Sequence, residues 1–476
     1  MPTIYQTDLS IPSFGGINQS TDGYNMSMRY AVSATNADVT GGGLAPMRKG
    51  IAIAQQLLSP IGTLARLHRR YHAKENEKDV LVAISDGRLW TKLLDHDDEW
   101  KAQYGGLSVD VCDWVTYEVN KPDSDAPTDV LLFTNAKDGM FCLYGDTLQV
   151  EPVKTPYKFG VLARYNERIW GSGIEDDPDK LVYSAPFDPF NWEQNSEIPE
   201  DGAGEIMQPS WDGDSFVALR PFGSQLLAFK KNAIWRILGA NPGDFIMKEQ
   251  YGGGALEENT IAVTGSYSMM LGYGGIVRYD GADAAPFLQE QVRDIMAQVN
   301  PVARSSACGI MDGKSYMLAL PLGESEQNNA VLKYNMTEQS FSLMRDVSVK
   351  SFLAFDGRVF YTSAEAPGRV FEFGNGDVLP MTWVSGYQDL GAKSSVKSAF
   401  ELYYRIDSDE QFIPLTFRIR TEKKAKEKNV IITSGKSMRT AINVSGRFFR
   451  LEIISISAKF WRLSSGIELH CELDPD

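Results

Sequence analysis

The sequence VLVAISDGRLW, Val80–Trp90, contains the pattern that decides the fold. A run of aliphatic residues ends at Ser85, an Asp-Gly pair follows, and a second run begins at Arg88. Aspartate and glycine tolerate the positive φ angles that a tight two-residue turn requires. The pattern therefore predicts a β-hairpin.

The same pattern of short β-branched and aromatic runs around a turn returns along the next three hundred residues. Hairpins are expected at 80–90, 130–144, 168–183, 225–237, 269–279, 315–334 and 352–361. Their mean spacing of about 45 residues is typical of four-stranded propeller blades. A sandwich needs only about seven strands, and this region holds at least twice as many. We predict an all-β fold with an irregular β-propeller of six or seven blades; a string of sandwiches is the alternative.

After Trp383 the pattern changes to alternating apolar and polar residues, which predicts an antiparallel, sandwich-like β-sheet domain. The charge changes as well, because Pro380–Asp476 contains 15 Lys and Arg against 12 Asp and Glu. We expect an extended N-terminal arm and first strand at 1–60, a propeller at 61–383 and a C-terminal β-domain at 384–476. One helix is expected at 289–300, where apolar residues follow a helical period.

Composition limits the function. A formal net charge of -15 argues against a protein that reads nucleic-acid sequence, which usually has a basic face. The N-terminus lacks the pattern of a signal peptide, and no apolar stretch is long enough to span a membrane. The four cysteines are far apart and have no C-x-x-C spacing, so we expect reduced thiols in a protein made in the cytoplasm.

No motif in the chain predicts catalysis, a cofactor or a metal. Gly435-Lys436-Ser437 lacks the upstream glycine of a phosphate loop, and His68 and His72 lack the glutamate of H-E-x-x-H. The acidic run Glu175–Asp179 lacks the glycine and spacing of a calcium loop, so we interpret it as a solvated loop. We expect neither an enzyme nor a cofactor.

The N-terminal segment is rich in glycine and small residues but is no phosphate loop, because Gly50 follows the lysine and no helix follows. Its candidate motif residues are Gly15, Gly16, Asn18, Asn36, Gly43, Arg48 and Gly50. This motif resembles the N-terminal arm of β-propeller tail proteins of tailed bacteriophages, including tail nozzle, or packaged-DNA stabilisation, proteins at the head-to-tail connector. The stretches 235–245 and 446–453 also resemble parts of that family.

The resemblance implies a structural virion protein of the tail, synthesised in the host cytoplasm and assembled as a ring of six copies. Its partners would be other copies of itself, the adaptor and portal ring, and distal tail proteins such as fibres, spikes or a needle. Double-stranded DNA would pass through the lumen, and be retained, without sequence reading. A negatively charged chain suits such a conduit, because phosphate contacts would hold the DNA.

Two other functions stay open. Exposed aromatic clusters on one propeller face would favour a propeller-type virion adhesin or carbohydrate-binding protein. Paired carboxylates about 5 to 9 Å apart in a pocket would favour a glycan-cleaving propeller.

The densest basic run, 421–429, is expected to form the tip of a hairpin between strands at 415–420 and 430–432. Its basic residues are Lys423, Lys424, Lys426 and Lys428. One interpretation is a solvated turn in which Glu422 and Glu427 offset part of the charge. The other is a lumen-facing or neighbour-facing loop that touches DNA or an acidic neighbouring ring.

Overall fold

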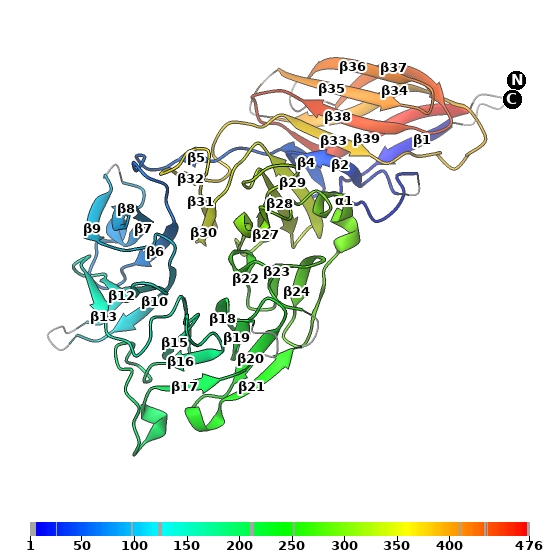
Figure 1. Ribbon diagram of the computed structural model, residues 1–476. Coiled ribbons are helices and arrows are strands. Elements are labelled where there is room, and N and C mark those ends of the chain that lie inside the picture. The colour runs from blue at the N-terminus through cyan, green and yellow to red at the C-terminus, as the bar shows by residue number, and fades with distance from the viewer. Residues whose placement is uncertain are drawn as a thin grey trace, which may run out of the picture.

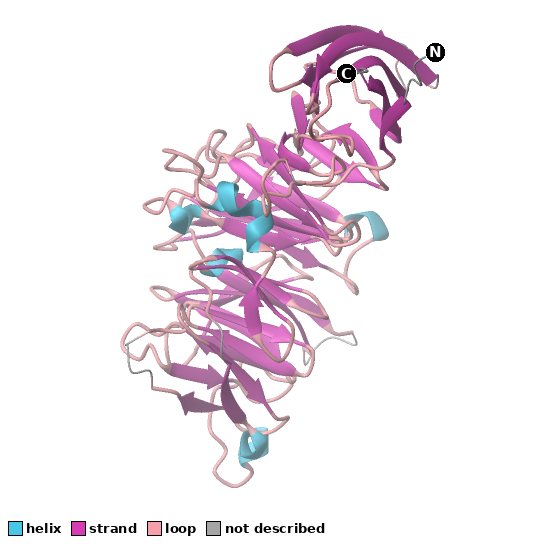
Figure 2. Cartoon of the chain, turned by 90° about the vertical axis from the view of Figure 1, so that its right-hand side faces the viewer, coloured by secondary structure: helices cyan, strands magenta, loops and turns pink. Residues whose placement is uncertain are grey.

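The computed structural model describes the chain except residues 1–5, 25, 97–98, 122–125, 210–213, 251–252, 409, 411, 433–434, 436 and 474–476. The chain forms a ring of four-stranded sheets with a two-sheet sandwich beside it (Figure 1). In the side view the sandwich extends beyond one end of the ring, so the molecule is elongated (Figure 2).

Seven antiparallel sheets of four strands form the ring, which confirms the predicted β-propeller and gives it seven blades. The innermost strands of successive blades lie against one another, and the last blade meets the first.

From inner to outer strand, the first four blades are β6 (Thr63–His68), β7 (Asp79–Ser85), β8 (Arg88–Leu93), β9 (Lys101–Gly105); β10 (Asp113–Val119), β11 (Thr128–Asn135), β12 (Gly139–Tyr144), β13 (Val150–Val153); β14 (Val161–Tyr165), β15 (Arg168–Ser172), β16 (Lys180–Tyr183), β17 (Gly204–Met207); and β18 (Ala218–Phe222), β19 (Gln225–Phe229), β20 (Ile234–Leu238), β21 (Ile246–Gln250). The last three are β22 (Ala262–Val263), β23 (Ser268–Gly272), β24 (Gly275–Tyr279), β25 (Ala284–Pro286); β26 (Cys308–Met311), β27 (Ser315–Leu320), β28 (Ala330–Asn335), β29 (Ser340–Arg345); and β30 (Ser351–Phe355), β31 (Arg358–Thr362), β32 (Val370–Glu372), β5 (Ile51–Ala52).

The predicted hairpins are pairs of adjacent strands in these blades. Asp86 and Gly87 join β7 to β8 with φ angles of 56° and 65°, as a tight turn with two positive φ angles requires. In six blades the predicted hairpin joins the second and third strands, but in the seventh it joins the first and second, β30 and β31. The seventh blade differs because its outer strand, β5, comes from the N-terminal segment.

The sandwich contains one six-stranded sheet, in the order β3-β4-β39-β34-β37 with β1 also paired to β39, and one five-stranded sheet, β2-β33-β38-β35-β36. Its strands are β1 (Gln6–Ile11), β2 (Ala31–Thr35), β3 (Ala37–Thr40), β4 (Gly43–Pro46), β33 (Met381–Ser385), β34 (Lys397–Asp407), β35 (Ile413–Arg420), β36 (Ala425–Ile432), β37 (Ser437–Gly446), β38 (Arg450–Ser455) and β39 (Arg462–Leu473).

These assignments differ from the predicted division at residues 60 and 383. The segment 1–60 is no separate arm: β1 to β4 belong to the sandwich and β5 to the propeller. Strand β33 begins at Met381 and pairs with β2 and β38, so the sandwich starts before residue 384. The alternation of apolar and polar residues could not predict these pairings. The strands that pair with β1, β2 and β5 lie hundreds of residues further along the chain.

The helices are short. The 3₁₀ turns are η1 (Glu75–Glu77), η2 (Pro199–Asp201), η3 (Pro242–Asp244), η4 (Glu258–Thr260), η5 (Gln289–Val292) and η6 (Arg304–Ser306), and the α-helix is α1 (Arg293–Met296). The helix predicted at 289–300 is therefore only η5 followed by α1. Val292, with φ -124° and ψ 20°, breaks the helical backbone between them. Val292 and Ile295 are still buried in the main core, as their period indicates.

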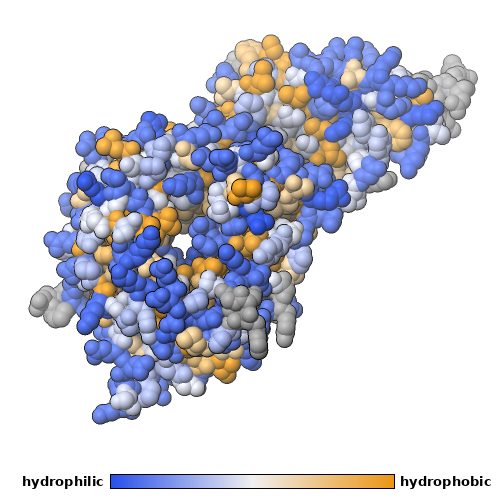
Figure 3. Space-filling view, in the orientation of Figure 1, coloured by the Kyte–Doolittle hydropathy of each residue, from blue (hydrophilic) through white to orange (hydrophobic). Residues whose placement is uncertain are grey.

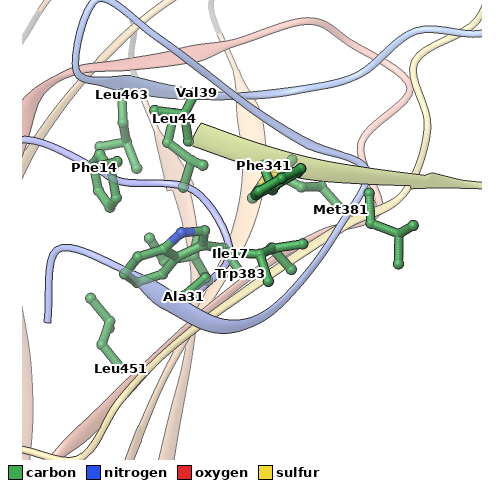
Figure 4. Close-up of a cluster of buried hydrophobic side chains, with 14 of the residues drawn as sticks. Phe14, Ile17, Ala31, Val39, Leu44, Phe341, Met381, Trp383, Leu451 and Leu463 are labelled. Atoms are coloured by element: carbon green, nitrogen blue, oxygen red, sulfur yellow. The ribbon is translucent and has the colours of Figure 1, made fainter. Parts of the chain in front are cut away.

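One hydrophobic core runs from blades five and six into the sandwich. Phe341 of β29 lies beside Ile17 and Ala31 of the N-terminal segment, and Trp383 of β33 lies at the centre of the same group (Figure 4). The ring of Phe14 packs edge-on against Trp383 with 5.2 Å between ring centroids. The N-terminal segment therefore binds the propeller and the sandwich into one packed unit.

We expect Phe14→Ala to lower the free energy of unfolding by about 3 to 5 kcal/mol, because the side chain is 1% exposed and the ring leaves a cavity against Trp383. Urea unfolding followed by tryptophan fluorescence measures the change. Phe187→Ala is the matched control, since Phe187 is 75% exposed and its loss should cost about 0.5 kcal/mol or less. Equal effects of the two variants would contradict the shared core.

Candidate functional site

The glycines of the predicted arm motif lie where the N-terminal segment passes other backbone closely. A β-carbon on Gly16 would lie 2.4 Å from the carbonyl oxygen of Phe341, and one on Gly15 would lie 2.6 Å from the ring of Tyr30. The backbone N–H of Ile17 donates a 2.8 Å hydrogen bond to the same Phe341 oxygen. The glycines allow the segment to lie directly on blade six.

Asn36 is the most strongly bound residue of the motif. It is 1% exposed and has a φ of 55°, a left-handed conformation that asparagine tolerates better than most residues. Its side-chain amide donates to the Pro380 carbonyl at 2.9 Å, and its Oδ1 accepts the N–H of Arg345 at 2.7 Å. Its own N–H donates to the Leu343 carbonyl at 2.7 Å. Asn36 therefore joins blade six to the segment that enters the sandwich.

Two more motif glycines allow close contacts, one in each part of the molecule. A β-carbon on Gly43 would lie 2.7 Å from the Leu463 carbonyl oxygen in the sandwich, and one on Gly50 would lie 2.5 Å from the ring of Tyr361 in blade seven. Asn18 has a local role, because its Oδ1 accepts hydrogen bonds from the backbone and hydroxyl of Ser20.

Arg48 borders a groove between blade seven and the sandwich, which we name the junction groove. The groove has a volume of about 610 Å³ and is lined by residues 48–52, 375–378, 410 and 458–460. The guanidinium of Arg48 lies over the ring of Phe460, with its carbon 4.8 Å from the ring centroid. No described carboxylate forms an ion pair with Arg48, whereas Lys459 pairs with Glu410 at 2.8 Å.

The predicted basic tip is shorter than expected. The turn covers only Thr421 to Lys424, closed by a hydrogen bond from the Thr421 N–H to the Lys424 carbonyl at 2.7 Å. Lys423 and Lys424 are exposed in this turn, and Lys426 and Lys428 already belong to β36. These four residues are named the lysine edge, because β36 is the edge strand of its sheet. Charged residues on an edge strand oppose further strand pairing.

The two nearby glutamates do not neutralise the lysine edge by direct pairing. The Glu422 carboxylate accepts the backbone N–H groups of Arg447 and Phe448. Burial raises the pKa of Glu422, but these hydrogen bonds outweigh it and hold the pKa below its usual value. Glu427 pairs with Arg418 at 2.6 Å. No described carboxylate lies within ion-pair distance of the four lysines.

The other candidates from the sequence make structural contacts. His68 Nδ1 lies 2.8 Å from Asp79, which also pairs with Arg66, and His72 Nε2 lies 3.1 Å from the Pro127 carbonyl. In the acidic run 175–179, Asp177 pairs with Lys180 and Asp179 with the buried Lys230. Among the described residues no three or more His, Cys, Asp or Glu side chains gather as a group that could hold a metal ion.

The structure adds a site that no sequence motif indicated. A cavity of about 600 Å³ opens where the first residues of the inner strands converge at the middle of the propeller. The surface in Figure 3 is hollowed at this place. Its lining comes from all seven blades, so only the closed ring brings these residues together.

Known proteins were compared with this chain. No family model and no curated protein sequence matches it. Among solved structures it is similar to the WD40 domain of Pan2 from Neurospora crassa, at 10% identity, a TM-score of 0.38, and coverage of 67% of this chain and 90% of that one. It is also similar to BamB from Moraxella catarrhalis, at 10% identity, a TM-score of 0.40, and coverage of 72% of this chain and 99% of that one. A third similar structure is BBS1N in complex with ARL6DN, at 10% identity, a TM-score of 0.42, and coverage of 69% of this chain and 98% of that one. At this identity the likeness concerns the fold alone.

Within the described part of the chain, no helix has the length and apolar character that crossing a bilayer would need.

We expect Asn36→Ala to destabilise the protein by about 3 kcal/mol, because it leaves the Arg345 N–H and the Pro380 carbonyl without their partner and puts alanine at a positive φ. Asn18→Ala is the matched control, with an expected loss within about 0.5 kcal/mol, since its bonds to Ser20 are exposed. Urea unfolding measures both. A loss for Asn36→Ala no larger than for Asn18→Ala would refute the role given to Asn36.

Proposed function

We propose that this protein is a structural component of a bacteriophage tail, a nozzle or connector ring through which DNA passes and is retained. The lysine edge carries the proposal. The chain is strongly acidic as a whole, yet four lysines stand together on one strand and its turn without a carboxylate partner among the described residues. Unpaired cations at one place suit a contact with DNA phosphates or with an acidic neighbouring ring.

The position of the lysine edge supports this function. Strand β36 lies on the side of the sandwich that faces away from the propeller (Figure 1). In an elongated subunit, such a surface is free to meet a neighbour or the lumen of a ring. Symmetry would repeat the four charges once per copy, so a ring of six would present a belt of lysines.

The N-terminal motif also supports this function. The residues that resemble those of tail nozzle proteins are the ones that fix the sandwich to the propeller, through Gly16 on blade six, Asn36 at the junction and Gly50 on blade seven. A conduit that contains packaged DNA needs subunits whose parts keep one relative position. The shared core provides such a constraint.

The direct test is to locate the protein in intact particles of the phage that encodes it. Cryo-electron microscopy of the tail should show the propeller and sandwich as repeated densities in a ring below the portal and adaptor, with six copies expected. The same density at the tips of fibres would instead support the adhesin alternative. Absence of the protein from purified particles would refute a virion role altogether.

Replacing Lys423, Lys424, Lys426 and Lys428 with Ser tests the lysine edge. Folding should be preserved, with each exposed change within about 0.5 kcal/mol, while particles should lose DNA retention or fail to complete the tail. A matched variant replaces the exposed residues Lys101, Lys137, Lys154 and Lys248 with Ser, and so removes the same charge elsewhere. Equal titre and genome retention in both variants would show that the lysine edge is only a solvated surface.

A further inference from the structure

The cavity at the middle of the propeller has the size and lining of a ligand site. Its volume of about 600 Å³ lies within the usual range for small-molecule pockets. A second cavity of about 380 Å³ continues it towards blades six and seven. The two share the lining residues Gly62, Val111, Asn259, Gly309, Ser351 and Phe352.

Several polar groups in this cavity have no side-chain partner among the described residues. No described side chain donates a hydrogen bond to the carboxyl of Glu258 or forms an ion pair with it. The indole N–H of Trp114 and the ammonium of Lys350 likewise have no partner among the described residues. Glu257, by contrast, pairs with Arg304 outside the cavity lining. Glu258 and Lys350 are exposed, so their charged groups are open to solvent and to a ligand.

Arg220 lines the same cavity. Its Nη1 is 3.4 Å from the Asp113 carboxylate on blade two and donates to the Leu219 carbonyl, and its other N–H groups bond to no described residue. Asp113 also accepts the backbone N–H of Leu162 on blade three at 3.0 Å. The cavity floor is therefore pre-organised across blades two, three and four.

The surroundings shift the pKa values of two charged side chains in these cavities. Burial raises the pKa of the Glu258 carboxyl; a hydrogen bond from its own backbone N–H opposes that shift, and nearby Glu257 adds to it. Burial lowers the pKa of Lys350, and Asp110 opposes that shift. Both residues are exposed, so a ligand can reach them.

We propose that this cavity binds a neutral oligosaccharide. Positively and negatively charged side chains both line the cavity. A ligand with charge of a single sign would therefore lie near a like charge as well as an opposite one. A sugar hydroxyl both donates and accepts, and can therefore pair with Glu258, Lys350, Arg220 and the indole N–H alike. The partly exposed aromatic side chains Trp114 and Phe352 offer apolar faces for the C–H groups of a pyranose ring.

The proposal is independent of the tail function and is tested on the purified full-length chain. Fluorescently labelled protein is applied to an array of neutral, anionic and cationic oligosaccharides, and each retained glycan is then titrated by calorimetry. Retention of neutral glycans supports the proposal. Retention of anionic glycans only would overturn it in favour of an anion site at Arg220 and Lys350, and retention of none would overturn it altogether.

Single-residue variants then test whether the glycan binds in this cavity. Glu258→Gln and Trp114→Ala should each weaken binding of the retained neutral glycan at least tenfold. Glu197→Gln and Phe187→Ala, at exposed positions on blade three, should leave it unchanged. Thermal unfolding checks that Trp114→Ala is folded, and Glu258→Gln, which keeps the size of the side chain, decides the result if it is not. Unchanged affinity in Glu258→Gln would refute the site.

Discussion

The hydrogen bonds of Asn36 are the constraint on which the arrangement of the two parts depends. They hold the N-terminal segment against Leu343 and Arg345 of blade six and against Pro380 at the entrance to the sandwich. A buried donor or acceptor without its partner costs about 1 to 3 kcal/mol. Because asparagine bonds to both neighbours and also tolerates the positive φ, few other residues could replace it.

From this point the N-terminal segment reaches in both directions. Towards the N-terminus, β1 and β2 add strands to the sandwich, and β3 and β4 follow directly after Asn36. Towards the C-terminus, after β4, β5 pairs with β32 and completes blade seven. The N-terminal segment therefore completes a blade whose other three strands lie about three hundred residues later in the chain. The same segment also contributes strands to the sandwich. Neither part is complete without it.

The propeller could be predicted from the sequence because its signal is local. Asp86-Gly87 and the apolar runs beside it specify a hairpin through contacts among about ten residues. The seventh hairpin, β30 and β31, was also predicted from the sequence. The outer strand of its blade was not, because β5 lies about three hundred residues earlier in the chain. The helix at 289–300 was overestimated because periodicity predicts burial, which Val292 and Ile295 have, without showing the backbone break at Val292.

Several residues singled out in the sequence lie where backbone geometry restricts the residue type, but their functional roles stay predictions. Gly16 and Asn36 were singled out because their segment resembles the arm of tail proteins, and the structure adds that their positions tolerate few other side chains. Glu427 pairs with Arg418 rather than with a lysine because of the register between β35 and β36. That register could not be derived from the composition of the basic run. The cavity at the centre of the propeller was not predicted, because its open groups come from separate blades.

The two surfaces with unpaired charge differ in a way that separates their functions. The lysine edge has four cations against two neighbouring carboxylates, Glu422 and Glu427, which make their contacts elsewhere, so the excess of positive charge favours an extended anionic partner. In the propeller cavity, Arg220 lies beside Asp113, and the unpaired Glu258 and Lys350 have opposite charges. A polyanion would be attracted to the first and gain little at the second. A neutral polyhydroxyl ligand would satisfy the cavity and gain little at the edge. The proposed contact with DNA or a neighbouring ring at the sandwich and the proposed ligand of the propeller therefore concern separate surfaces.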